Sequence, residues 1–442
     1  MASVSPPDDR TYLYFMITGL LIALAGGFVL AVVAPLAATG VLPYEEKSQL
    51  LIQAHGWAQL VGFAGVIVAG MALRLIPRFA GVPPPRVRLA AGALVLLSLS
   101  AIVRMIAQPW IDGDLGEALL LIAGVAGSVG MVLVAAMLFR ILTSGKRPRD
   151  PWRDFARAGA AWWLVWAVLS SYAVFQAVDE GRYVPLRIED DAAWVAMLGV
   201  IASFIWAVQS RSVPVFYGRK SPRRKQVIVP FALLQGGLAL TTASIFLHAG
   251  EWSWRLEGAG LASTGAAFVW LAPVAGSVWG RAKRLRPRAR MASRNVLVAN
   301  WSALGAGLLL VWAGIDTVLA GQYEAFWARD SARHLIALGT ITILILGMAQ
   351  LLTPVFALER AESRRLRFRD EAIFWLLVLA LLTRVSSGLL ADVTSYDLRM
   401  RHAAYAGIFA WAGLALFAWR LRTAIRREPE MKALLGFKEA GS

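Results

Sequence analysis

A chain of 442 residues that is 58% hydrophobic and only 17% charged exceeds the apolar share of a water-soluble domain, so its composition excludes an ordinary soluble protein. The formal net charge of +17 has the sign that nucleic acid attracts, but the basic residues gather in loops between apolar segments, which argues against nucleic-acid binding. The absence of cysteine excludes disulfides, thioether-attached c-type haem, thiolate-ligated iron–sulfur clusters and a cysteine copper site.

Apolar segments of roughly twenty residues, each long enough to cross about 30 Å of hydrocarbon, follow one another along the chain. We expect twelve, near 11–34, 50–74, 88–107, 115–142, 157–177, 192–211, 226–248, 258–279, 295–319, 332–354, 371–391 and 402–421. The first is not a cleavable signal peptide, because Asp8, Asp9 and Arg10 lead directly into a full-length span. The sequence therefore predicts an all-α polytopic membrane protein with twelve transmembrane helices, a single domain over residues 1–442 surrounded by the lipid bilayer.

Three stretches of the chain, 55–81, 194–218 and 334–357, repeat one another at a spacing of about 140 residues. They align without gaps on Gly62/Gly199/Gly339, Pro77/Pro214/Pro354 and Phe79/Phe216/Phe356. A period of this length indicates a unit of several helices that is used three times. We expect four-helix repeats at about 11–145, 150–285 and 290–425, followed by a cytoplasmic tail at 426–442.

Basic residues gather in alternate loops between the expected spans. These loops lie at 74–88, 146–157, 219–225, 281–290 and 360–369. The remaining loops carry acidic residues, namely Glu45, Glu46, Asp112, Asp114, Asp179, Glu180, Asp190, Asp191 and Glu251. The positive-inside rule makes the basic loops cytoplasmic, which places both termini inside and the protein in a bacterial cytoplasmic (inner) membrane. Binding of anionic lipid headgroups by the same loops is an alternative, secondary role.

The chain has only four histidines, His55, His248, His334 and His402, each expected at the outer end of a span. Taken singly, each is typical of a solvated helix end. His55 and His334 differ because they lie on equivalent segments of the first and third repeats, seven and five residues before the shared glycine. Two residues of α-helix turn through about 200°, so these side chains face roughly opposite ways. Two imidazoles arranged in this way could clamp a flat cofactor between the helices.

Other residues of the same segments allow two interpretations. Gly62 and Gly70 would let a porphyrin approach the backbone, but close helix packing explains them equally well. Arg104 and Arg384 correspond between the first and third repeats and lie within apolar spans, where an arginine is usually paired with a negative group such as a haem propionate. Snorkelling to the outer headgroups is the alternative for both. The second repeat lacks both features, so we expect one site where the first and third repeats meet.

The sequence Ala54-His55-Gly56 and the pair Arg333-His334 resemble parts of the haem–copper oxidase superfamily, whose large subunit has twelve helices in three four-helix arcs. In that superfamily one histidine on the second helix and one on the tenth hold the low-spin haem. Arg384 falls on the helix that carries propionate-binding arginines. The ligand of the high-spin haem is replaced by Ala332, and the sixth and seventh spans lack the copper-binding histidines. The resemblance therefore implies a fold of this kind without the oxidase binuclear centre.

Among the superfamily's relatives, the chain is most similar to the NnrS family, membrane proteins described as containing haem and copper and associated with nitric-oxide metabolism and nitrosative stress. The runs 55–81 and 332–350 carry this resemblance. The chain departs from the family at His55-Gly56-Trp57-Ala58-Gln59, where His-x-His-Glu-Met is usual, and at Ala357-Leu358-Glu359-Arg360, which replaces a histidine-containing motif. The resemblance implies a haem b ligated by His55 and His334, with Arg384 and Arg104 near its propionates, and leaves copper open.

The resemblance implies a role in nitric-oxide tolerance or membrane electron transfer, with nitric oxide or a redox partner as the interacting species. The alternative is a membrane transporter, or a quinone-linked or assembly subunit, without bound haem. Glu324, Asp330, Asp392 and Asp397 could assist metal binding or proton entry at the outer face, although solvation of loops is the more common role of such residues. Whether the protein is an enzyme, its substrate, its electron donor, the number of haems and its oligomeric state are left open.

Overall fold

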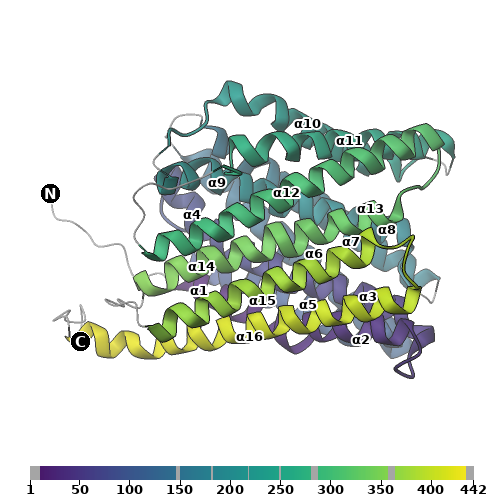
Figure 1. Cartoon of the computed structure of the whole chain (residues 1–442), viewed down its shortest axis with the longest axis horizontal. Coiled ribbons are helices and arrows are strands. Elements are labelled where there is room, and N and C mark those ends of the chain that lie inside the picture. Colours follow the sequence, from purple (N-terminus) through teal and green to yellow (C-terminus); the bar gives the residue numbers. More distant parts are fainter. Residues whose placement is uncertain are drawn as a thin grey trace.

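The computed structural model describes residues 10–145, 150–180, 183–217, 219–247, 250–279, 287–356 and 364–434. They form a bundle of long helices that run side by side, and the first helix begins at the end of the bundle where the last one finishes (Figure 1). The helices are α1 (Thr11–Ile22), α2 (Phe28–Ala38), α3 (Ser48–Trp57), α4 (Val66–Ala80), α5 (Val87–Ala107), α6 (Asp114–Ser144), α7 (Pro151–Asp179), α8 (Leu186–Trp194), α9 (Ala202–Tyr217), α10 (Arg224–Ser244), α11 (Glu251–Val274), α12 (Pro287–Ala320), α13 (Phe326–His334), α14 (Ile343–Phe356), α15 (Arg364–Leu389) and α16 (Tyr396–Leu434). The prediction of an all-α polytopic membrane protein is confirmed.

Within the described residues, eleven helical segments are long and apolar enough to cross a bilayer. They are Thr11–Ala38, Glu45–Ala80, Val87–Trp110, Asp114–Ser144, Pro151–Asp179, Leu186–Pro214, Arg224–Ser244, Ser293–Ala320, Phe326–Gln350, Arg367–Leu389 and Tyr396–Ile425. The remaining expected span, 258–279, falls on α11, whose 24 residues are long enough but include Glu257 and many small or hydroxyl-bearing residues. The count of twelve therefore stays a prediction, and α11 is the helix on which it depends.

Helices that follow one another in the chain pack as neighbours. α5 packs on α6, α6 on α7, α10 on α11, α11 on α12, and α15 on α16. The last helix also packs on the first span, since α16 contacts α2. The bundle is therefore a closed ring, in which the beginning and the end of the chain lie side by side (Figure 1).

The three repeated stretches form the centre of this ring. Buried residues make up 78% of the most apolar part of Glu45–Ala80, 89% in Leu186–Pro214 and 67% in Phe326–Gln350, against 33–56% in the other spans. Each of these three spans contains a π-helical segment: Ala58–Gly65, Val195–Ile201 and Leu335–Thr342. All three begin four residues before the shared glycine, at Gly62, Gly199 and Gly339. The backbone thus makes the same departure from α-helix at the same register in each stretch.

The shared glycines are sites of close helix packing. A Cβ atom on Gly62 would lie 2.5 Å from Ile22 and 2.9 Å from Ala101, on the preceding and following spans. The other two glycines have equivalent neighbours. A Cβ atom on Gly199 would meet Trp162 and Leu238, and one on Gly339 would meet Ser302 and Leu381. Of the two interpretations of Gly62, packing between helices is therefore the one that the contacts support. The same holds for Gly70, where an added Cβ atom would collide with Phe15.

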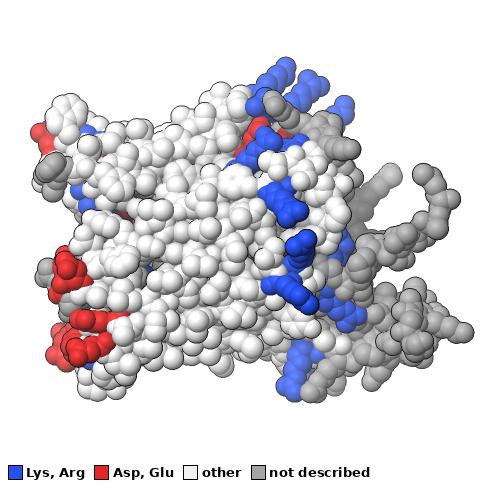
Figure 2. All heavy atoms as spheres, turned by 180° about the vertical axis from the view of Figure 1, so that it is seen from behind, with Lys and Arg blue, Asp and Glu red and all other residues white. Residues whose placement is uncertain are grey.

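Charge is distributed unequally between the two ends of the bundle. Figure 2 shows most of the Lys and Arg side chains at one end, most of the Asp and Glu side chains at the other, and between them a broad band with almost no charged side chains. Arg86 and Arg88 lie at the first end, whereas Glu45 and Glu46 precede α3 at the second. An uncharged band bounded by two charged rims is what a bilayer requires of the surface of a spanning protein.

Candidate functional site

His55 lies in the last turn of α3, at the acidic end of the bundle. Its Nδ1 atom is 2.8 Å from the backbone carbonyl oxygen of Gly27, on the neighbouring span. A carbonyl oxygen only accepts hydrogen bonds, so Nδ1 carries the proton and donates it, and Nε2 keeps its lone pair. Histidines that bind a metal usually make such a contact with their other ring nitrogen.

His334, the last residue of α13, is held in the same way. Its Nδ1 atom lies 2.8 Å from the backbone oxygen of Asp330 and 3.3 Å from the carboxylate oxygen Oδ1 of the same residue. Arg384 on α15 binds the Asp330 carboxylate with both ends of its guanidinium, at 2.9 Å and 3.0 Å. Asp330 therefore orients both predicted site residues, and simple loop solvation is the wrong interpretation of it. Its position four residues before His334, one helical turn, is the signal that could have identified it.

The structure brings His55, His334 and Arg384 together. His55 is close enough to His334 and Arg384 to interact with both electrostatically. The His334 side chain keeps 22% of its surface exposed, and Asp330 and Arg384 are also only partly buried, so the group borders open space. A Cβ atom added to Gly56, next to His55, would meet nothing within 4 Å. The donor set fits a cofactor that takes one imidazole from each side.

The junction between the second and third repeats is built differently at the position that corresponds to Gly56. Arg333 lies six residues before the shared glycine of the third repeat and forms an ion pair with Asp190 of the second. Gly56 is the residue at the corresponding position of the first repeat. The junction between the second and third repeats therefore holds a guanidinium against a carboxylate, whereas the corresponding position beside His55 is a glycine without a side chain.

Arg104 lies at a different junction from the histidines. Its side chain is fully buried, and it forms an ion pair with Glu189 at 3.0 Å and donates to the Gln108 side chain at 2.6 Å. Its guanidinium stacks 4.3 Å from the ring centre of Trp57, which points about 200° around α3 from His55. Arg104 therefore has a carboxylate partner between the first and second repeats, and we leave it out of the site.

Of the other two histidines, only His402 is described by the structure. His402 is partly exposed on α16, and His248 lies outside the described residues. The described residues contain no set of three or more His, Cys, Asp or Glu side chains that could hold a metal ion. The donor set that is present supplies two imidazoles, which suits the axial positions of a haem better than an independent copper ion.

The helices form a closed ring in an all-α, polytopic membrane protein, and polar groups lie where the repeats meet. Three central helices share the same geometry, each with a π-helical segment at the same register. The chain belongs to the NnrS family: the family model described as NnrS protein matches residues 12–428, nearly the whole chain. No curated protein matches the sequence. The resemblance that the histidine-containing runs indicated is confirmed at the level of the family.

Proposed function

We propose that this member of the NnrS family binds one haem b through His55 and His334 and acts in the response to nitric oxide or in membrane electron transfer. One observation carries the proposal. Two imidazoles from equivalent helices each have Nδ1 held by a backbone carbonyl, and neither Nε2 atom has a hydrogen-bond partner among the described residues; Arg384 is near enough to act electrostatically on both rings. Such anchoring sets the tautomer and the ring orientation before any metal binds.

The residues around the imidazoles hold either the rings or Arg384 in position. The carbonyl groups of Gly27 and Asp330 fix the rings, and the Asp330 carboxylate holds Arg384 in place. Arg384 has five N–H donors, of which the contacts with Asp330 and Ser387 use only part, so it can also receive a propionate. A haem held by His55 and His334 would supply one-electron transfer.

The proposal is tested first on the whole protein. The full-length chain, purified in detergent, should show the sharp absorption bands of a reduced low-spin b-type haem after dithionite is added. A pyridine haemochrome assay then gives the ratio of haem to chain. Protein that is folded and free of haem, even after expression with excess haem precursor, would contradict the proposal and give precedence to a transporter without bound haem.

The charged rims also support an orientation. We place the basic end, with both termini, in the cytoplasm and the histidines near the outer face of a bacterial inner membrane. A reporter that is active only in the cytoplasm should give signal when fused after Arg224, at the start of α10, and none when fused after Glu251, at the start of α11. The opposite pattern would reverse the orientation, and signal from both fusions would show that α10 does not span the membrane.

A further inference from the structure

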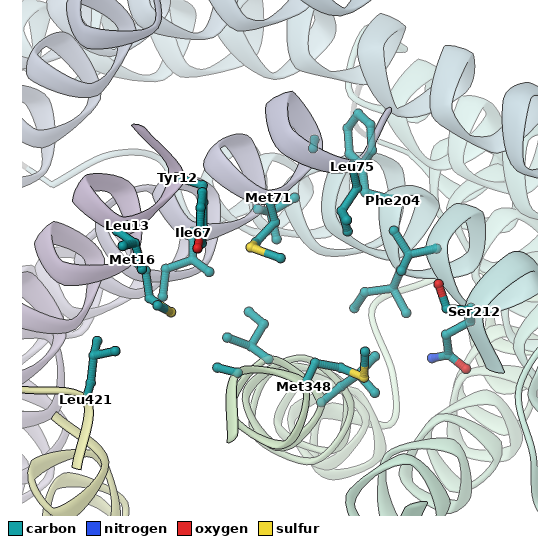
Figure 3. Close-up of a pocket in the computed structure, with 18 of the residues that line it drawn as sticks. Tyr12, Leu13, Met16, Ile67, Met71, Leu75, Phe204, Ser212, Met348 and Leu421 are labelled. Atoms are coloured by element: carbon teal, nitrogen blue, oxygen red, sulfur yellow. The ribbon is translucent and has the colours of Figure 1, made fainter. Parts of the chain in front are cut away.

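A second feature lies in the other half of the bundle, toward the basic end. The inner parts of α4, α9 and α14, together with α1 and α16, surround a cavity of about 240 Å³. Figure 3 shows Tyr12, Met16, Met71, Phe204 and Met348 around this central space. The lining side chains are almost all apolar, and none of them is ionised. An anion or a cation would therefore lose its hydration without gaining a partner.

The cavity follows the repeats. Met71, Val208 and Met348 each lie nine residues after the shared glycine, and all three line it. One position breaks the pattern. Ten residues after the glycine, the first and third repeats have Ala72 and Ala349, whereas the second has Gln209. A glutamine therefore replaces a methyl group at one of three equivalent places in an apolar wall.

The amide of Gln209 lacks the contacts that a buried amide needs. Gln209 is 2% exposed, and neither Oε1 nor Nε2 has a hydrogen-bond partner in the part of the chain that the structure describes. A buried amide without partners destabilises the protein, and native proteins rarely leave both of its atoms unpaired. The amide thus points to a ligand that supplies an acceptor, a donor or both.

We propose that this cavity binds a lipophilic, uncharged ring compound of the quinone class, with the Gln209 amide as its polar contact. Cavities of about 150 Å³ with aliphatic walls accept benzene, so a substituted six-membered ring suits the larger space here. An amide can donate from Nε2 to a quinone carbonyl and accept at Oε1 from a quinol hydroxyl, so one side chain serves both redox forms. Such a compound reaches the cavity from the bilayer, and Ile425 of its lining is 37% exposed.

This inference does not rest on the proposed haem site. Met71 follows His55 by sixteen residues, which is about 24 Å along a helix. The two sites are therefore at different depths, and each can fail without the other. The proposal concerns binding and includes no redox step.

The test uses the full-length protein in lipid nanodiscs with a decyl-substituted benzoquinone as the probe, and calorimetry gives its dissociation constant. Gln209→Leu keeps the volume of the side chain and removes its polar atoms, so it should fold at least as well and bind the probe about tenfold more weakly or worse. Gln176→Leu, the matched control on α7, should bind as the unmodified protein does. Equal affinity in the unmodified protein and Gln209→Leu would show that the cavity takes an apolar chain only, which overturns the proposal.

A second measurement keeps the test independent of the effect of one substitution. The chain has no cysteine, so Met71→Cys provides a single thiol in the cavity. The decyl-substituted benzoquinone should slow the reaction of this thiol with a membrane-permeant maleimide. In the double variant Met71→Cys/Ala72→Phe, the added ring fills the cavity, so the benzoquinone should no longer slow the reaction. The absence of protection in Met71→Cys alone would place the probe elsewhere and overturn the proposal.

Discussion

Replacing either His55 or His334 with alanine is expected to abolish the low-spin haem spectrum of the purified protein. Each variant removes one of the two Nε2 atoms, and among the described residues His402 on α16 makes no hydrogen bond or ion pair with His55, His334 or Asp330. His402→Ala is therefore the matched control, and it should keep the absorption bands of the unmodified protein. The spectra of all three variants, recorded on equal amounts of folded protein, check the assignment.

The neighbouring cation should have a smaller and different effect. Arg384→Leu keeps both imidazoles, so the spectrum should remain low-spin, but it removes a charge in a poorly screened setting and frees Asp330. The midpoint potential should fall, or haem should be lost more readily on dilution. Histidine variants that retain the haem content and spectrum of the unmodified protein would contradict the ligand assignment, whatever the result for Arg384→Leu.

The largest loss of stability is expected from Glu257→Leu. Glu257 on α11 forms an ion pair with Arg329 on α13, and these side chains are only 4% and 1% exposed. A guanidinium cannot lose its proton in a protein, so Arg329 would remain charged and buried after the loss of its ion-pair partner. Removal of one partner of a buried pair costs about 3–5 kcal/mol in soluble proteins. We expect a fall of this order in the free energy of unfolding, measured in mixed detergent micelles.

Two comparisons separate this effect from a general loss of packing. Arg329→Met should cost less than Glu257→Leu, because an isolated carboxylate can take up a proton and Arg187 lies 3.8 Å from Glu257. The double variant Glu257→Leu/Arg329→Met should recover most of the lost stability. Glu251→Leu removes a carboxylate of an exposed ion pair on the same helix and should change stability by only about 0.5 kcal/mol. Equal losses in Glu257→Leu and Glu251→Leu would show that burial of the pair has no energetic weight.

Tyr323 belongs to the same charged surroundings, at the acidic end of the bundle. Its ring lies 4.3 Å from the guanidinium of Arg329, and burial, together with the charge of Asp190, raises the pKa of its phenol to about 12. The phenol therefore stays neutral over the whole physiological range. It covers the Arg329–Glu257 pair without adding a charge that could weaken it.

The features that could be predicted from the sequence are those encoded by residue type and spacing. Apolar length indicated the spans, and the register of His55 and His334 relative to Gly62 and Gly339 indicated opposite faces of equivalent helices. Both histidines precede the π-helical segments, so the α-helical angle used for them applies to the structure as well. That Arg384 lies near His334 could also be predicted, because both residues belong to the third repeat; both contact Asp330.

Features that depend on partners distant in the chain could not be predicted. Glu189 is 85 residues from Arg104, and nothing in either segment indicates that the carboxylate neutralises this arginine in place of a propionate. The packing role of Gly62 depends on Ile22 and Ala101, which come from two other spans. Glu257 lowers the apolar character of α11, and its partner Arg329 is 72 residues away. Composition alone therefore does not show that the charge of this helix is neutralised within the bundle.

The π-helical segments of the three central spans also have an evolutionary consequence. One residue inserted into an α-helix whose two ends are held by packing leaves a local π-helical turn. Segments that begin four residues before Gly62, Gly199 and Gly339 are most simply explained by one insertion in a single ancestral unit that was later copied twice. An alignment of this chain with a distant relative that lacks the π-helical turns should therefore need a one-residue gap in each of the three central helices. In an alignment without these gaps, either the histidines or the cavity-lining residues would be out of register with the corresponding residues of the relative.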